Sequence, residues 1–365
     1  MRSFATVGHP GALALIERAI TSNRPPHALL LVGPERVGKT TLALDLAAGL
    51  LCLAGDPADR PCGECTACRK VAHGNHPDLH RLAPEGAGQQ IRVGQIHQLV
   101  GDLALLPLEG RFRIAVLENA QRLNIDAQNA LLKTLEEPPS AVVLVLAAGD
   151  ATSLLPTVVS RCARVRLGPV PSEDIGRMLA NAGIADGARG AALGRLSGGR
   201  PGIAFALASQ PEAAIVPARL SAALLDLISA DRRQRLAAQQ SLIEDGAALA
   251  AASAGAATEA ASGRPERGSR RVSPAERRAA VVQVLAVWRE VARDLAVAVR
   301  GGRREVRQHE LLDELVSIGA RVEPAAVTRF LGRVESVSRA IDAYANPELA
   351  LDALLLDWPR PRQAA

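Results

Sequence analysis

The chain has 365 residues, a length that predicts two or three domains with a sizeable core. Its formal net charge is +5, and only 2% of its residues are aromatic. It contains no apolar run of about 18 residues and begins without a signal-peptide pattern, which excludes a membrane span and predicts a cytoplasmic location. The mild positive charge permits contact with nucleic-acid phosphates without requiring it, and the scarcity of aromatics argues against a stacking platform for single strands.

A complete phosphate-binding motif follows the first predicted strand. Residues 28–32 form an apolar run, residues 33–40 read G-P-E-R-V-G-K-T, and a helical pattern begins at Thr41. In this setting the backbone N–H groups surround phosphate oxygens, and the helix N-terminus adds favourable partial charge. We expect Lys39 to reach the β- and γ-phosphates and the Thr40 hydroxyl to bind Mg²⁺. An ordinary glycine turn before a helix is the alternative.

The motif therefore predicts a site for ATP or ADP, with Mg²⁺. The loop residues expected to bind the nucleotide are Gly33, Pro34, Val37, Gly38, Lys39, Thr40 and Thr41.

Four cysteines follow the predicted phosphate-loop helix. They are Cys52, Cys62, Cys65 and Cys68, spaced C-x9-C-x2-C-x2-C. Cytoplasmic thiols stay reduced, which disfavours disulfides, and four thiolates with no open position are typical of a structural Zn²⁺ site. An iron–sulfur cluster and free thiols remain alternatives. The nearby His73 and His76 are interpreted as surface residues, because four thiolates already saturate the ion, with a role as substitute ligands as the alternative.

Apolar strands alternate with helical patterns up to residue 167, which predicts a parallel sheet with crossover helices. The predicted strands are Ala28–Val32, Asp78–Leu82, Ile114–Glu118, Val142–Ala147 and Ala163–Leu167. A helix is predicted over residues 126–136, ending before two prolines. The carboxylates Glu136 and Glu137 at its end are interpreted as solvated or structural.

Beyond Pro169 the pattern changes to short helices up to about Ser209, and an all-helical region starts near Ala213. Residues from about 247 to 273 are rich in Ala, Gly, Ser and Arg, which predicts a flexible insertion. A helix is the alternative for its Ala-rich first half. Helical periodicity resumes at Ala275, so the fold class is α/β plus all-α.

Several further segments belong together. Residues 113–124 read R-I-A-V-L-E-N-A-Q-R-L-N, residues 127–139 read A-Q-N-A-L-L-K-T-L-E-E-P-P, and Ser160, Arg161 and Cys162 follow L-L-P-T-V-V. With the cysteine cluster, these segments make the chain resemble the bacterial clamp-loader subunits of DNA polymerase III, closely over residues 1 to about 210. Cys162 itself is interpreted as a small buried packing residue.

This family is of the AAA+ type, and the resemblance implies a RecA-like parallel sheet with a zinc module, a small helical lid and a helical collar that assembles a ring. It implies a nucleotide-binding domain over residues 1–167 with the zinc module at 52–76. The lid follows over residues 168–210. The collar, or oligomerisation domain, covers residues 211–365 and contains the insertion.

Departures from the family's ATPase subunit, gamma/tau, indicate which subunit type the chain resembles. The ATPase has Asp-Glu where this chain has Glu118 and Asn119. Glu118 can still support Mg²⁺ through water, but an amide cannot act as the general base. Gly202 stands where the ATPase has a lid arginine, and Ala147-Ala148-Gly149 replaces a small polar sensor.

These losses beside an intact phosphate loop resemble the delta-prime type of subunit. That type is a largely non-hydrolysing stator, and the resemblance implies that Arg161 acts in trans as an arginine finger at a neighbour's ATP site. The implied partners are the gamma/tau and delta subunits in a hetero-oligomeric ring, with the sliding clamp and primed DNA reached through the assembled complex during DNA replication. No membrane partner is implied.

Whether the chain is itself an enzyme stays uncertain. It would be a subunit of a DNA-directed DNA polymerase complex, a nucleotidyltransferase, and would bind ATP but hydrolyse it poorly or not at all. A hydrolysing gamma/tau-like clamp-loader ATPase is the first alternative, and a free-standing P-loop nucleotide enzyme is a more remote one.

Overall fold

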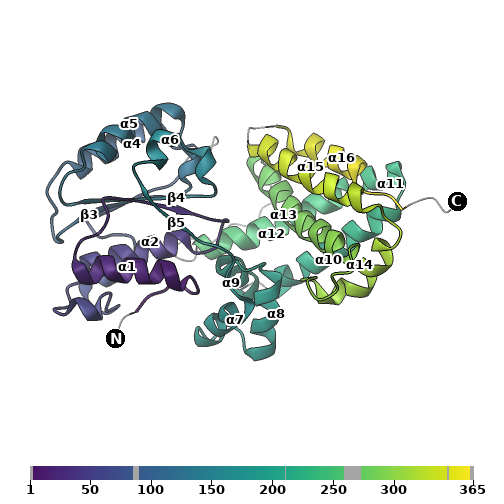
Figure 1. Ribbon diagram of the computed structural model, residues 1–365, viewed down its shortest axis with the longest axis horizontal. Helices are drawn as coiled ribbons and strands as arrows, with labels where there is room; N and C mark the ends of the chain where they lie inside the picture. Colours follow the sequence, from purple (N-terminus) through teal and green to yellow (C-terminus); the bar gives the residue numbers. More distant parts are fainter. Residues whose placement is uncertain (1–2, 85–89, 210, 259–272, 343–344, 362–365) are drawn as a thin grey trace. The chain divides into compact units, whose positions relative to one another are not determined.

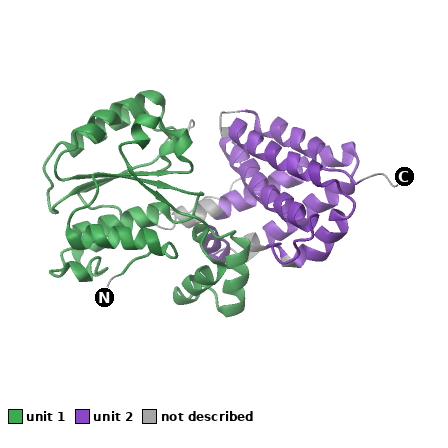
Figure 2. Ribbon diagram, viewed as in Figure 1, with its two compact units in different colours: residues 1–202 green, residues 203–365 purple. Residues whose placement is uncertain are grey.

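The computed structural model describes residues 3–84, 90–209, 211–258, 273–342 and 345–361. The chain divides into two compact units, residues 1–202 and residues 203–365 (Figure 2). The first unit contains a parallel sheet with helices, and the second is helical (Figure 1). This confirms the predicted fold class, an α/β part with a parallel sheet followed by an all-α part.

The sheet consists of β1 (Ala28–Val32), β2 (Leu79–Leu82), β3 (Arg113–Leu117), β4 (Val142–Ala148) and β5 (Ala163–Arg166). Its strands are parallel and run in the order β2-β3-β4-β1-β5. Each agrees with a predicted strand to within one residue at either end. Because β1 lies between β4 and β5, the loop after β1 emerges between the carboxyl ends of both, where open parallel sheets bind ligands.

Helices cover both faces of the sheet. Figure 1 shows α1 and α2 on one face and α4, α5 and α6 on the other. The helices of this layer are α1 (Pro10–Ser22), α2 (Lys39–Leu51), α3 (Thr66–Ala72), α4 (Val93–Leu103), α5 (Ile125–Glu136) and α6 (Pro156–Val159), with short 3-10 turns η1 (Pro57–Asp59), η2 (Ala120–Arg122) and η3 (Ala151–Ser153).

The sequence folds into these layers because the central strands β1, β3 and β4 are buried on both faces. Along β1, Leu29 and Leu31 pack into the core under α1 and α2, whereas Ala28 and Leu30 pack into the core under α4 and α5. Side chains alternate between faces along a strand, so a continuous apolar run is what a sheet covered on both sides requires. The loop after β1 is thus supported by a core on either side.

Three short helices follow the sheet, as predicted. They are α7 (Ser172–Asn181), α8 (Gly187–Leu196) and α9 (Pro201–Ser209), and α9 crosses the boundary between the two units.

The second unit is built around buried aromatic rings. Its helices are α10 (Pro211–Ser229), α11 (Arg232–Ala237), α12 (Gln239–Thr258), α13 (Pro274–Ala298), α14 (Leu312–Gly319), α15 (Pro324–Asp342) and α16 (Pro347–Asp357), with η4 (His309–Leu311). The rings of Trp288, Phe330 and Trp358 have centroids 4.5–5.4 Å apart. The buried Arg235 donates to the carbonyls of Ile228 and Trp358, and burial lowers its pKa to about 10.

The segment predicted as a flexible insertion begins inside α12. Residues 247–258 are helical, which matches the helix alternative, and residues 259–272 lie outside the described residues. The physical reason is tertiary packing, because Leu249 and Ala252 are buried in this helix. None of the described helices has the length and apolar character that a membrane crossing needs.

Candidate nucleotide and metal sites

The phosphate loop lies between the ends of β4 and β5, the two strands that flank β1. The Gly33 N–H donates to the carbonyl of Ala148 at 3.2 Å, at the end of β4. A Cβ atom at position 33 would lie 2.2 Å from the carbonyl oxygen of Leu167, just beyond β5. Any side chain there would push the loop away from β5, so the first glycine of the motif is required by packing as well as by phosphate approach.

Lys39 occupies the inside of the loop. Its Nζ atom donates to the carbonyl oxygens of Gly33 and Pro34, both at 2.7 Å, and the residue is 7% exposed. Burial lowers the pKa of Lys39, and the nearby Glu35 carboxylate partly offsets this. The ammonium therefore sits among the loop carbonyls, where it can exchange these acceptors for phosphate oxygens.

Two positive φ angles and one further contact shape the backbone of the loop. Gly38 and Arg36 have positive φ values of 112° and 60°, which give the loop its curl. The His9 Nε2 atom lies 3.1 Å from the Val37 carbonyl oxygen. Of the other predicted residues, Pro34 is exposed, Val37 is buried, and Thr40 and Thr41 are half-buried in the first turn of α2. The structure thus gathers the predicted loop residues into one cradle.

Gly202, where the resemblance predicts the loss of a lid arginine, contacts this loop. The Gly202 N–H donates to the carbonyl of Arg36 at 3.1 Å. An added Cβ atom at position 202 would lie 3.1 Å from the Arg36 Cβ and 3.3 Å from its carbonyl oxygen. A longer side chain at this position would therefore need the start of α9 to move.

Glu118 and Asn119 directly follow β3, where the resemblance predicts the second nucleotide motif. The Glu118 Oε1 atom pairs with Arg81 of β2, 2.6 Å from Nη2 and 3.0 Å from Nε. Asn119 is exposed and left-handed, with φ 52° and ψ 50°. Glu118 is therefore already engaged by a neighbouring strand, a contact that sequence reasoning did not anticipate because the residues are far apart in the chain.

The end of β4 offers no polar side chain. Ala147 and Ala148 are buried, and the Gly149 N–H donates to the Oε1 atom of Gln121 at 3.1 Å. The amide of Gln121, from η2, is thus the polar group held at this position. The sequence contained no spacing signal for it.

Arg161 lies at the amino ends of the parallel strands, whereas the phosphate loop lies at their carboxyl ends. It precedes β5, whereas the loop follows β1, and the two strands are parallel with Leu29 beside Ala163. The 4 residues of β5 advance about 3.3 Å each, so roughly 13 Å of strand separates the two ends.

Two groups hold the Arg161 side chain. Its Nη1 atom donates to the carbonyl of Thr157 at 2.9 Å, and its Nη2 atom lies 2.6 Å from the Oε1 atom of Glu136. The Arg161 side chain is 35% exposed. The adjacent Cys162 is half-buried against the core, and burial raises the pKa of its thiol to about 11, as befits a packing residue.

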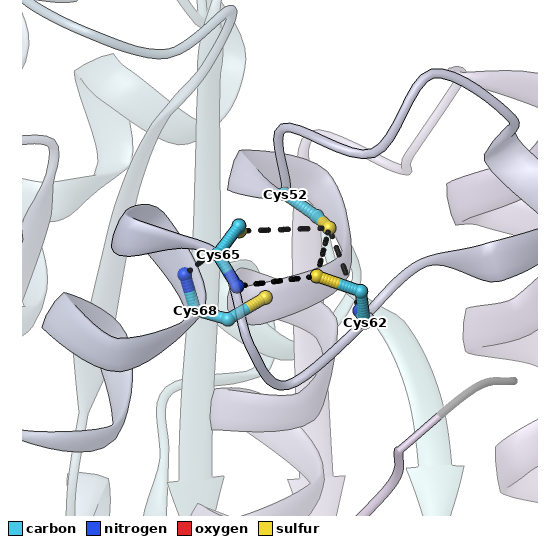
Figure 3. A group of neighbouring side chains, drawn as sticks. All are labelled: Cys52, Cys62, Cys65 and Cys68. Carbon is cyan, nitrogen blue, oxygen red and sulfur yellow. Dashed lines mark hydrogen bonds between the residues drawn. The ribbon is translucent and has the colours of Figure 1, made fainter.

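The four cysteines converge on one spot (Figure 3). Cys52 caps the end of α2, Cys62 lies in the following loop, and Cys65 and Cys68 belong to the start of α3. All four Sγ atoms lie within 4.8 Å of one another, and Cys52 is 3.6 Å from Cys62 and 3.9 Å from Cys65. Thiolates about 2.3 Å from one tetrahedral ion would be roughly 3.8 Å apart, so this set fits Zn²⁺.

Backbone N–H groups point at these sulfurs. Cys62, Cys65 and Cys68 each donate to the Sγ atom of the preceding cysteine in the set, at 3.4–3.5 Å. Burial acts to raise the pKa of Cys65, but hydrogen bonds from the Leu53 and Cys68 N–H groups outweigh it and bring the pKa to about 6. Burial raises the pKa of Cys68 well above its ordinary value.

The histidines near this cluster are not among its members. His73 is exposed, as expected, but the interpretation of His76 as a surface residue is wrong. His76 is 3% exposed, and its Nδ1 atom accepts a hydrogen bond from the Asp78 N–H at 3.1 Å. Burial lowers the pKa of His76, which favours the neutral ring in this role.

Residues 8–171 match the protein family described as "DNA polymerase III, delta subunit". The chain is 46% identical to DNA polymerase III subunit delta' of Pseudomonas aeruginosa over 136 residues. This matched segment covers 37% of this chain and 41% of that protein. Over 181 residues the chain is 35% identical to subunit tau/gamma of Haemophilus influenzae, which covers 49% of this chain and 26% of that protein.

Among solved structures, a DNA polymerase III gamma subunit-related protein of Thermotoga maritima covers 94% of this chain and 97% of its own, with 17% identity and a TM-score of 0.42. The chain spans less than half the length of the two sequence relatives. The sequence comparisons confirm the resemblance to DNA polymerase III clamp-loader subunits, and to the delta-prime type among them, over the N-terminal part of the chain.

Proposed function

We propose that the chain is a delta-prime-type clamp-loader subunit of DNA polymerase III that binds nucleotide and hydrolyses it poorly or not at all. One observation carries this proposal: a completely built phosphate loop is combined with an amide, Asn119, two residues beyond the end of β3. A carboxylate at such a position can accept a proton from the attacking water, whereas an amide cannot.

Further features of the site support weak hydrolysis. The Glu118 carboxylate is paired with Arg81, so it is less available to a hydrated Mg²⁺ ion. At the lid, Gly202 packs its backbone against Arg36 and provides no cation for the γ-phosphate. The buried alanines at the end of β4 provide no sensor side chain.

In this proposal Arg161 acts on the nucleotide of a neighbouring subunit. Its position at the amino edge of the sheet puts it out of reach of its own phosphate loop, across roughly 13 Å of strand. A guanidinium neutralises charge on a transferred phosphoryl group and fits its oxygens as a planar fork. Arginine fingers supplied in trans accelerate phosphoryl transfer by about 10³–10⁵-fold in well-studied cases.

The cysteine cluster is proposed to hold one structural Zn²⁺ ion through Cys52, Cys62, Cys65 and Cys68. The ion would stabilise the fold of the module and take no part in phosphate chemistry. Cys52 and Lys39 lie at opposite ends of α2, 13 residues and so about 20 Å apart.

The proposed partners are the gamma/tau and delta subunits in a ring, which acts in the cytoplasm on the sliding clamp and primed DNA. The division into a nucleotide domain (1–167), a lid (168–210) and a collar (211–365) is part of the proposal. The collar would supply the assembly surface, since its helices form a compact unit of their own.

The test separates binding from hydrolysis in the isolated chain. Calorimetry should detect binding of Mg-ATP or Mg-ADP, and Lys39→Ala should abolish it. Typical enzymes turn over at about 10 s⁻¹. Loss of a general base removes about 10²–10⁴-fold, so steady-state turnover is expected below roughly 0.1 s⁻¹. Turnover near the typical value, lost in Lys39→Ala, would contradict the stator role and favour a hydrolysing gamma/tau-like ATPase.

A further inference from the structure

We infer that Glu136 is a positioning residue for Arg161: its carboxylate holds the guanidinium at the edge of the sheet in an orientation that a neighbouring subunit's phosphates can use. The inference rests on the proposed role of Arg161 in trans. It assigns a specific task to a carboxylate that the sequence pattern suggested was solvated or structural.

The first observation is that the guanidinium is held at two different nitrogens. Nη2 lies 2.6 Å from Glu136 Oε1, and Nη1 donates to the Thr157 carbonyl at 2.9 Å. Two anchors on separate nitrogens restrain rotation of the planar group, which a single contact would not do. These contacts engage only part of the five N–H donors of arginine, so the group can still donate to a phosphate.

The second observation is where the anchors come from. Glu136 is the last residue of α5, and the Thr157 carbonyl lies in α6. The Thr157 carbonyl oxygen also accepts the Ser160 hydroxyl at 3.1 Å, which helps to fix its position. Arg161 therefore lies against two acceptor groups from separate helices.

The third observation is that these two helices are fixed to each other. Gln128 of α5 is 4% exposed, and its Oε1 atom accepts the Leu155 N–H at the start of α6 at 2.7 Å. Its Nε2 atom donates to the Leu123 carbonyl at 3.1 Å. Leu135 and Val158, which neighbour the anchors in sequence, are buried in the same core. The anchors are thus held at constant separation.

An ion pair of this exposure has little value for stability alone. The side chains of Arg161 and Glu136 are 35% and 50% exposed, and exposed pairs of this kind contribute little to the free energy of folding. The pair instead orders the Arg161 side chain. This matters because a long arginine side chain loses rotamer freedom when it binds a phosphate. Ordering it beforehand reduces that loss in the transition state.

The experiment uses a complete loader reconstituted with the gamma/tau and delta subunits, clamp and primed DNA, and measures stimulated ATP turnover. The chain is supplied as wild type, Glu136→Ala, Glu136→Gln, Arg161→Ala and the Glu136→Ala/Arg161→Ala double variant. Glu137→Ala, the adjacent exposed carboxylate, is the matched control. Assembly is confirmed for each by mass measurement of the complex.

We expect Arg161→Ala to lower turnover, and Glu136→Ala to lower it by roughly threefold to tenfold. Glu136→Gln keeps an acceptor oxygen and should retain more activity than Glu136→Ala. The double variant should match Arg161→Ala, and Glu137→Ala should match the wild type. Such coupling is the signature of a residue that acts through Arg161.

Three results would overturn the inference while leaving the finger intact: higher turnover in Glu136→Ala, unchanged turnover in Glu136→Ala, or a further loss when Glu136→Ala is added to Arg161→Ala. The last would assign Glu136 a general structural role. Unchanged turnover in Arg161→Ala itself, with assembly confirmed, is a different outcome that removes the proposed trans role of the arginine.

Discussion

Asp78 determines the conformation of the loop that joins α4 to β3. It is fully buried and accepts the backbone N–H groups of Leu108 at 2.6 Å, Glu109 at 2.8 Å and Gly110 at 2.7 Å. Burial alone would raise the pKa of Asp78, but these hydrogen bonds outweigh it and lower the pKa below its ordinary value. One carboxylate therefore satisfies three consecutive donors that would otherwise need water.

We predict that Asp78→Asn lowers the free energy of unfolding by about 1–3 kcal/mol at pH 7, because an amide NH₂ cannot accept the N–H groups that one carboxylate oxygen served. A lowered folded-state pKa means that the carboxylate stabilises the fold above the unfolded pKa of about 3.9, and that this contribution is lost as pH falls through the folded value. Denaturation followed by circular dichroism at several pH values measures the difference.

The gap between wild type and Asp78→Asn should therefore be widest near neutrality and narrow below about pH 4. Asp126→Asn, an exposed position in the same unit, is the control and should change stability by no more than about 0.5 kcal/mol. A gap that stays constant down to pH 3 would show that Asp78 acts through packing and not through its charge.

Single residues also show what the sequence could predict and what it could not. The phosphate-loop residues were predictable because they are consecutive, and their spacing alone defines the cradle. The contacts of Arg81 with Glu118 and of Glu136 with Arg161 were not, because each joins residues far apart in the chain. Such pairs depend on strand order and helix ends, which a local pattern does not contain.

At the scale of elements, α2 links the two candidate sites. Its first residue is Lys39 of the phosphate loop, and Cys52 of the cysteine cluster caps its end. The short helix α3 and the loop before it have few buried side chains besides Ala67, Cys68 and Val71. A bound ion would therefore supply much of the free energy that orders this module.

We predict that the purified chain contains close to one equivalent of zinc, and that Cys65→Ser loses most of it and becomes more sensitive to proteolysis around residues 52–76. Cys162→Ser, which removes a thiol outside the cluster, should keep its zinc and serves as the control. Metal analysis by mass spectrometry provides the measurement. Less than roughly a tenth of an equivalent, or the visible absorbance of an iron–sulfur cluster, would refute the zinc assignment.

Elements differ in how well their pattern predicts them. The central strands β1, β3 and β4 were predictable to within one residue because both of their faces are buried, which leaves long apolar runs between turns. The helix over residues 247–258 was less certain from sequence, because its Ala-rich composition lacks a strong apolar stripe. Gly246 lies where an added Cβ atom would be 2.4 Å from the Ala280 carbonyl oxygen, so close approach to α13 orders this helix.

At the scale of the whole molecule, the two compact units differ in the probes they contain. The chain has 2 tryptophans, Trp288 and Trp358, and both belong to the unit of residues 203–365. The phosphate loop belongs to the unit of residues 1–202. Tryptophan fluorescence therefore reports the helical unit, while circular dichroism reports both.

We predict that saturating Mg-ADP stabilises the first unit alone. A ligand at about 100 times its Kd adds about 2.7 kcal/mol to the state that binds it. Thermal unfolding followed by circular dichroism should shift upward with nucleotide, while the transition followed by tryptophan fluorescence should stay in place. Lys39→Ala is the control and should show neither shift. Equal shifts in both signals would mean that the two units unfold as one.

The phosphate loop and Arg161 lie at opposite ends of the strands of one sheet, so the chain has two unlike surfaces that bear on nucleotide. In the proposed ring, the arginine edge of one subunit faces the loop edge of the next, so the contact joins two unlike surfaces. A row built by such contacts always ends in one unmatched loop and one unmatched arginine. A subunit that gives an arginine but does not hydrolyse needs none in return, so it can occupy the terminal place, and the assembly need not close at that junction.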